Sequence, residues 1–117
     1  MEALWADRAN LDTADPDVRA TVLEAVDLLD RGEARVAEIG RDGGVVVHEW
    51  LKQAILLLFP LARMETMEVG PFEYADKIPL KHNYQAQGVR VVPGASARYG
   101  SHLEPGVIMM PCYVNIG

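Results

Sequence analysis

The chain of 117 residues is long enough for one modest domain with its own core. Half of its residues are hydrophobic and 24% are charged, which is usual for a soluble globular protein. The net charge of −6 argues against non-specific nucleic-acid binding, although local positive charges can still hold an anionic ligand.

The cysteine content and the N-terminus indicate a reducing compartment. The single cysteine, Cys112, cannot form an intrachain disulfide. The start, MEALWADRAN, lacks the basic and apolar regions of a signal peptide. The longest apolar run, Ala54 to Phe59 with Leu61, is too short to span a bilayer. We therefore expect a cytoplasmic protein that does not bind membranes.

The first part of the chain carries a strong helix signal after a short helical segment expected at Glu2 to Ala9. Asp15 precedes Pro16 and Asp17, an order that suits an N-cap, the first helical position and the positive end of the helix dipole. Gly32 provides a C-terminal stop. The apolar residues in between recur at helical spacing and predict one buried face: Val18, Val22, Ala25, Val26 and Leu29.

A β-hairpin and a second helix are predicted next. Two β-prone runs, Ala34 to Ile39 and Val45 to Trp50, flank a glycine-rich stretch. The helix is expected from about Trp50 to Phe59, ending before Pro60. It is apolar nearly all round after Gln53, so we expect it to be buried.

The following stretch gives weaker signals. Between Met64 and Lys81, two prolines and a glycine argue against a long element. A short helix is expected around His82 to Gln87.

The last quarter of the chain repeats with a period of six. From Val91 it reads VVPGAS, ARYGSH, LEPGVI, MMPCYV and NIG, and we call residues 91–117 the hexad segment. One column is apolar (Val91, Ala97, Leu103, Met109), and another holds Gly94, Gly100, Gly106 and Cys112. Proline fixes φ and glycine takes the positive φ of a sharp corner, so the pattern predicts the short strands and turns of a hexapeptide β-helix. Because such coils are stable only in stacks, we expect the chain to be the N-terminal part of a longer protein.

Three histidines and one cysteine were considered as metal ligands or nucleophiles. His48, His82 and His102 have no short ligand spacing, so we expect ordinary polar side chains and no metal. Cys112 stands in the glycine column, where small size would explain it. No histidine is near it in sequence to activate a nucleophile. These residues do not predict a catalytic site.

Arg90 is the strongest binding candidate. It lies just before the hexad segment, in GVRVVPG, where a fixed guanidinium could form a bidentate pair with a carboxylate. The sequence alone favours the alternative, a solvent-facing charge on an alternating strand. Arg35, Lys52, Lys77 and Lys81 are weaker candidates. Lysines in loops usually just face water.

Four segments carry a resemblance to a known family. They are GEARVAE, VVVHEWLKQAILL, DKIPLK and GVRVVPGASARYGSHLEPGVIMMPCYVNIG, in that order over nearly the whole chain. Together they resemble tetrahydrodipicolinate N-succinyltransferase of the bacterial lysine and diaminopimelate pathway. That family usually has RVAEK, WLKKAVLL and MPSYVNIG where this chain has RVAEI, WLKQAILL and MPCYVNIG. These changes keep size or burial. The N-terminus looks shorter than usual by part of a helix.

The resemblance implies a fold and an activity. The fold is a mainly α N-terminal domain with a β-hairpin, residues 1–88, followed by about one and a half coils of a left-handed hexapeptide β-helix, residues 89–117. The activity is transfer of a succinyl group from succinyl-CoA to the amine of ring-opened tetrahydrodipicolinate. A homotrimer is implied, with active sites at the seams between subunits. Arg90 matches the family's substrate-binding arginine. The acidic catalytic residues and the CoA-binding coils are expected beyond Gly117, so no catalytic, cofactor or metal residue is assigned in this chain.

Two alternatives stay open at this point. The chain could be a non-catalytic trimerisation or interaction module. It could also belong to another hexapeptide acyltransferase that uses acetyl-CoA. A reading frame that continues in sixes after Gly117 would favour the succinyltransferase.

Overall fold

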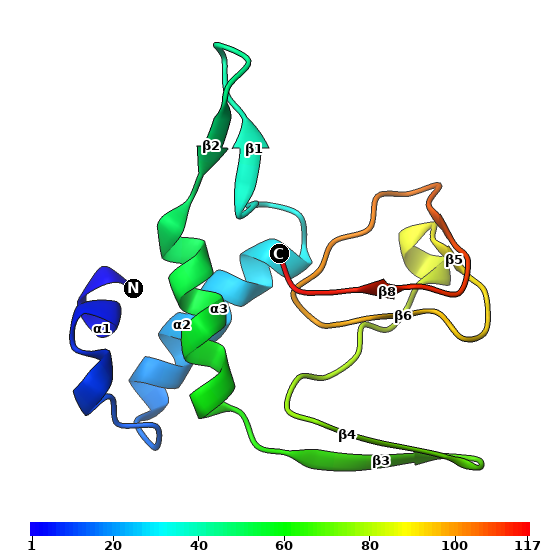
Figure 1. Cartoon of the computed structure of the whole chain (residues 1–117), viewed down its shortest axis with the longest axis horizontal. Coiled ribbons are helices and arrows are strands. Elements are labelled where there is room, and N and C mark those ends of the chain that lie inside the picture. Colours follow the sequence, from blue (N-terminus) through cyan, green and yellow to red (C-terminus); the bar gives the residue numbers. More distant parts are fainter.

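The structure is a computed structural model that describes all 117 residues. It contains three α-helices, two antiparallel hairpins and two short parallel strand pairs. The molecule is flat, with extents of 43 × 41 × 20 Å. The helices lie on one side and the hexad segment on the other, while the two hairpins project from the body (Figure 1). None of the helices has the length and apolar character needed to cross a lipid bilayer.

The elements follow one another in this order along the chain. They are α1 (Glu2–Ala6), a 3-10 turn (Arg8–Asn10), α2 (Pro16–Asp30), β1 (Ala37–Ile39), β2 (Val45–Val47), α3 (Glu49–Leu61), β3 (Glu65–Val69), β4 (Phe72–Asp76), a second 3-10 turn (Gln85–Gln87), β5 (Arg90–Val91), β6 (Ser96–Ala97), β7 (Ile108–Met109) and β8 (Tyr113–Val114). The short helix expected around residues 82–87 is thus a single 3-10 turn.

The prediction of α2 is confirmed from its cap to its buried face. The side chain of Asp15 accepts a hydrogen bond of 2.9 Å from the backbone N–H of Asp17, and Pro16 is the first helical residue. Gly32 adopts a φ of +74° just after the helix, as a C-terminal glycine should. The buried face packs against α3, and the two helices contribute most of the core: Val22, Ala25, Val26 and Leu29 from α2, and Leu51, Ala54, Leu57, Leu58 and Leu61 from α3.

The helix α3 differs from its prediction in two ways. It includes Pro60 in its last turn instead of ending before it. The carbonyl that Pro60 leaves without a helical partner belongs to Leu56, whose side chain is 57% exposed, so this carbonyl can tilt toward water at little cost. The exposed Leu56 also shows that the expected burial all round the helix is wrong.

Two hairpins flank α3. The predicted hairpin β1–β2 is confirmed, although its strands are shorter because Glu49 and Trp50 already belong to α3. The hairpin β3–β4 was not predicted. Its strands are joined at Gly70 and Pro71, and Gly70 takes a φ of +58°. Pro71 occupies the turn, where it interrupts no strand.

The hexad segment forms parallel strand pairs, β5 with β7 and β6 with β8. Arg90 pairs with Ile108, eighteen residues later, as expected if three hexads complete one circuit. The predicted apolar column points inward: Ala97, Leu103 and Met109 are buried together with Val89, and Val91, the first residue of the column, is partly buried against them.

The glycine column is explained by backbone conformation. Gly94, Gly100 and Gly106 have φ values of +99°, +93° and +94°, whereas Cys112 is exposed and is not among the residues of positive φ. The explanation of Cys112 by small size is therefore wrong, because an exposed position does not limit the side chain.

Candidate functional site

Arg90 lies on a rigid backbone with a free side chain. Its backbone N–H donates to the carbonyl of Val107 at 3.0 Å. Close by, the backbone N–H of Gly106 donates to the carbonyl of Gly88 at 2.8 Å. The side chain is exposed and takes part in none of the hydrogen bonds or ion pairs of the chain. A guanidinium with no carboxylate partner of its own is available for an anionic ligand.

The other cationic candidates are engaged in structural contacts. Arg35 lies 3.7 Å from Glu104, and Lys52 pairs with Glu49 one turn away in α3. Lys77 Nζ donates to the carbonyl of Phe59 at 3.2 Å, at the C-terminal end of α3. That helix has no basic residue of its own in its last turn, so the cation satisfies the negative end of the helix dipole.

Lys81 belongs to a partly buried polar cluster that joins the hexad segment to α2. Its Nζ donates to Asp30 Oδ1 at 2.7 Å and to the backbone carbonyl of Asp30 at 3.0 Å. The same Oδ1 atom accepts from the backbone N–H of Gly100 at 2.9 Å. Tyr99 donates its hydroxyl proton to Asp27 Oδ1. We call Asp27, Asp30, Lys81, Tyr99 and Gly100 the anchor cluster.

The anchor cluster also changes the chemistry of Tyr99. Burial raises the pKa of the phenol above its ordinary value, and the hydrogen bond to Asp27 and the negative charges of Asp27 and Asp30 raise it further. A phenol that keeps its proton serves as a donor here and not as a base.

Arg98 makes a second connection, between the hexad segment and β4. Its Nε and Nη2 donate to the two carboxylate oxygens of Asp76 at 3.1 and 3.0 Å, and its Nη1 donates to Asn115 Oδ1 at 3.2 Å. The guanidinium also lies 5.6 Å from the centre of the Phe59 ring. This fork-to-fork pair is strong in geometry and directional.

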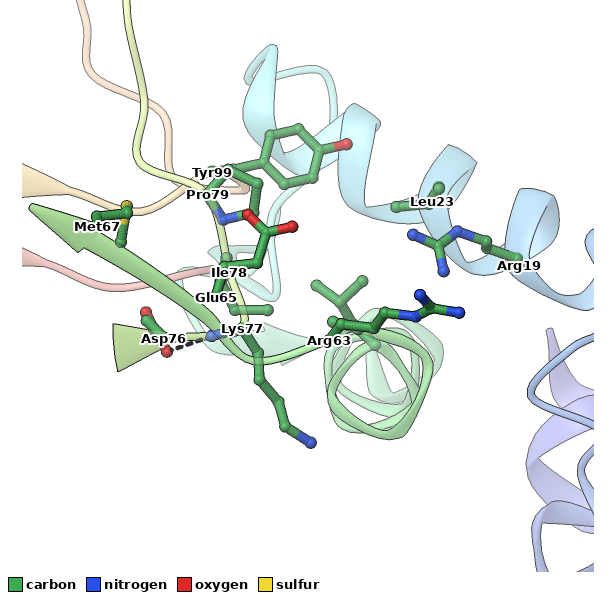
Figure 2. A pocket seen from close by; sticks show the side chains of 12 residues that line it. Arg19, Leu23, Arg63, Glu65, Met67, Asp76, Lys77, Ile78, Pro79 and Tyr99 are labelled. Carbon is green, nitrogen blue, oxygen red and sulfur yellow. Dashed lines mark hydrogen bonds between the residues drawn. The ribbon is translucent and has the colours of Figure 1, made fainter. Parts of the chain in front are cut away.

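A pocket of about 440 Å³ lies between α2, the end of α3 and the base of the β3–β4 hairpin. Arg19 and Arg63 lie at one side of it and Met67 at the other (Figure 2). Arg19 already donates to the carbonyl of Leu61 at 2.9 Å, and the lining mixes cations with Glu65 and Asp76. Arg90 does not line this pocket. The mixed charges select no single class of ligand.

Two of the three histidines lie close to glutamate side chains. His48 Nε2 lies 3.1 Å from Glu38 Oε1, and His102 Nε2 lies 3.5 Å from Glu104 Oε1. The ring of His102 covers Gly32 so closely that a Cβ there would overlap it. No group of three or more His, Cys, Asp or Glu side chains is arranged to hold a metal ion.

Arg90 as a substrate-binding residue stays a prediction, and sequence reasoning did not predict the anchor cluster. Asp30 and Lys81 are 51 residues apart, and Asp27 and Tyr99 are 72 apart. The only local signal was Tyr99, which stands where the other hexads have Pro93, Pro105 and Pro111.

Comparison with known proteins places the chain in a family. The family model described as "Tetrahydrodipicolinate N-succinyltransferase N-terminal" matches residues 1–61, more than half of the chain. The chain belongs to the tetrahydrodipicolinate N-succinyltransferase family.

Curated relatives agree with this assignment. The chain is 42% identical over 125 residues to the 2,3,4,5-tetrahydropyridine-2,6-dicarboxylate N-succinyltransferase of Pseudoalteromonas translucida, with 100% of this chain and 45% of the relative covered. It is 44% identical over 126 residues to the proteins of the same name from Methylorubrum extorquens and Ralstonia pickettii, again over 100% of this chain and over 45% and 46% of those relatives. The chain thus spans less than half the length of the curated relatives it matches.

Proposed function

We propose that the chain is part of an N-succinyltransferase that moves a succinyl group from succinyl-CoA to the amine of ring-opened tetrahydrodipicolinate. The observation that carries this proposal is the similarity to succinyltransferases over the whole chain, at 42–44% identity to relatives that carry this name. Cytoplasmic lysine and diaminopimelate biosynthesis is the corresponding role.

Arg90 is the residue of this chain that binds the substrate in this proposal. Tetrahydrodipicolinate is a dicarboxylate, and a guanidinium binds a carboxylate through two parallel hydrogen bonds. The free, exposed side chain on a fixed backbone supports this role, because nothing within the chain competes for it. The residues that bind CoA and move the amine proton belong, in this proposal, to the part of the relatives that the chain does not span.

We further propose that residues 89–117 begin a left-handed hexapeptide β-helix and that residues 1–88 form a separate N-terminal domain. The parallel pairing of Arg90 with Ile108 and of Ala97 with Val114 supports successive circuits of such a solenoid. A homotrimer with active sites between subunits follows from the same family assignment. Arg90, exposed on the hexad side of the molecule, would then face a neighbour.

The proposed activity is tested by thiol release from succinyl-CoA in the presence of tetrahydrodipicolinate. The 117-residue chain is compared with a version extended by the remaining coils. We expect turnover only from the extended version, because acyl transfer needs the thioester, the amine and a base held together. Silence from both versions would refute the succinyltransferase proposal. Turnover by the short chain would refute the placement of the chemistry outside it.

A further inference from the structure

The hairpin β1–β2 has one apolar face, and nothing in the chain covers it. Residues directly opposite in an antiparallel pair lie on the same face. The pairs Ala37↔Val47 and Ile39↔Val45 therefore form one apolar face, while the other face carries Glu38 opposite Val46. Ile39 is 71% exposed and Val45 is 69% exposed.

The hairpin β3–β4 is built in the same way. The pairs Met67↔Tyr74 and Val69↔Phe72 make the turn end of one face apolar, while the pair Glu65↔Asp76 lies on the same face at its base. The opposite face carries Glu68 directly across from Glu73. Phe72 is 62% exposed and Tyr74 is 51% exposed. The acidic face suits water, so the aromatic face is the one that gains from being covered.

The two apolar faces cannot cover each other within one chain. One hairpin ends just before α3 and the other begins just after it, and a helix of 13 residues is about 20 Å long. Figure 1 shows the hairpins projecting from opposite ends of α3. A two-stranded hairpin is only marginally stable by itself, so an uncovered apolar face is a poor final state.

The surface area sets an upper limit on the missing contact, because the part of the relatives that this chain does not span would cover some of it. The chain exposes 7918 Å², whereas a compact monomer of 12.9 kDa exposes roughly 6300 Å². The radius of gyration is 15.9 Å against about 13.4 Å for a compact domain of this length. The excess area of roughly 1600 Å² on one chain is comparable to what one subunit of a ring buries in two standard interfaces, at about 800 Å² each.

We propose that a second copy of this chain covers these faces, with the β1–β2 face of one copy packed against the β3–β4 face of the next. The inference rests on the proposed homotrimer. A closed ring of three joins two different patches of each subunit, and this chain presents two different apolar patches, one aliphatic and one aromatic. A face that paired with itself would give only a two-fold dimer.

The experiment uses sedimentation velocity of the 117-residue chain over a range of concentrations. Val45→Lys and Phe72→Lys place a charge on the two apolar faces. Val46→Lys and Ala75→Lys place the same charge on the opposite faces, where Glu38 and Glu73 lie nearby. We expect the wild type and both controls to associate, and each face variant to associate at least about 30-fold more weakly, the effect of losing a central interface side chain. Helical circular dichroism checks that every variant is folded.

The decisive sample mixes the two face variants. Each retains the face that the other lacks, so the mixture should form a one-to-one pair although neither variant associates alone. Face variants that associate like their controls overturn the inference and leave the trimer proposal to stand, since another surface would then join the subunits. A wild-type chain that stays monomeric, or a mixture that does not pair, also overturns it. The proposed activity is judged separately by thiol release from the extended version.

Discussion

The ion pair between Lys81 and Asp30 is a contact whose disruption we expect to destabilise the chain strongly. The Lys81 side chain is 5% exposed and the Asp30 side chain is 25% exposed. The substitution Lys81→Met keeps the length and the apolar stem and removes the ammonium group. It leaves the Asp30 carboxylate with the backbone N–H of Gly100 as its remaining donor.

The size of the effect follows from burial. Removing one partner of a fully buried pair costs about 3–5 kcal/mol, because the other charge stays buried and uncompensated. Water reaches part of Asp30, so we expect a loss of about 2–3 kcal/mol in the free energy of unfolding. With a urea slope of about 1–3 kcal/mol per M, the midpoint should fall by roughly 0.7–3 M. The matched control is Lys52→Met, whose pair with Glu49 is 48% and 65% exposed and should change stability by less than about 0.5 kcal/mol.

A double variant identifies the cause of the loss. Adding Asp30→Asn to Lys81→Met removes the stranded charge but keeps an oxygen that accepts from Gly100. The double variant should therefore unfold at higher urea than Lys81→Met alone. If Lys81→Met behaves like Lys52→Met, the buried pair does not matter for stability. If the double variant gains nothing, the loss does not come from an uncompensated carboxylate.

Three further predictions concern binding, packing and pH. In the extended enzyme, Arg90→Lys should weaken dicarboxylate binding by about 1–3 kcal/mol and leave the Michaelis constant for succinyl-CoA nearly unchanged; equal effects on both substrates would show a structural role. Gly100→Ala should lower the urea midpoint more than Gly106→Ala, because both have positive φ but only the first would place a Cβ 2.9 Å from the Ile116 side chain; equal losses would contradict the packing. Because the folded chain holds the Tyr99 proton more tightly than the unfolded chain, its contribution to stability should be complete below about pH 10 and decline as the pH rises above it. Tyr99→Phe should lose that part of the alkaline decline in the urea midpoint, and an unchanged slope would contradict the raised pKa.

Elements with complete local signals could be predicted from the sequence. The helix α2 has a cap, a proline at its first position, an apolar face and a terminal glycine, and the structure agrees with each. The inward apolar column of the hexad segment was also predictable, because a six-residue period leaves one side chain per strand facing the core.

Elements that depend on tertiary contacts could not be predicted. The strands of β3–β4 alternate polar and apolar residues, but Gly70 and Pro71 were interpreted as interruptions when they form the turn. Pro60 is accepted inside α3 because the Leu56 carbonyl that it leaves unpaired lies on the exposed side of the helix. Lys77 and Arg19 separately donate to the last carbonyls of the helix, those of Phe59 and Leu61. No local pattern contains such donors, since they come from distant parts of the chain.

The position of Arg90 relative to the helices is set by contacts that the sequence did not predict. The backbone of Arg90 is fixed to β7, and β6, the next strand of the same segment, leads directly into Arg98, Tyr99 and Gly100, which connect to β4 and α2. The guanidinium of Arg90 is therefore a flexible group on a base that α2 holds in place. A substrate carboxylate bound there would be positioned relative to the helices through the anchor cluster. For this reason Lys81→Met in the extended enzyme should weaken dicarboxylate binding as well as stability, whereas Lys52→Met should change neither.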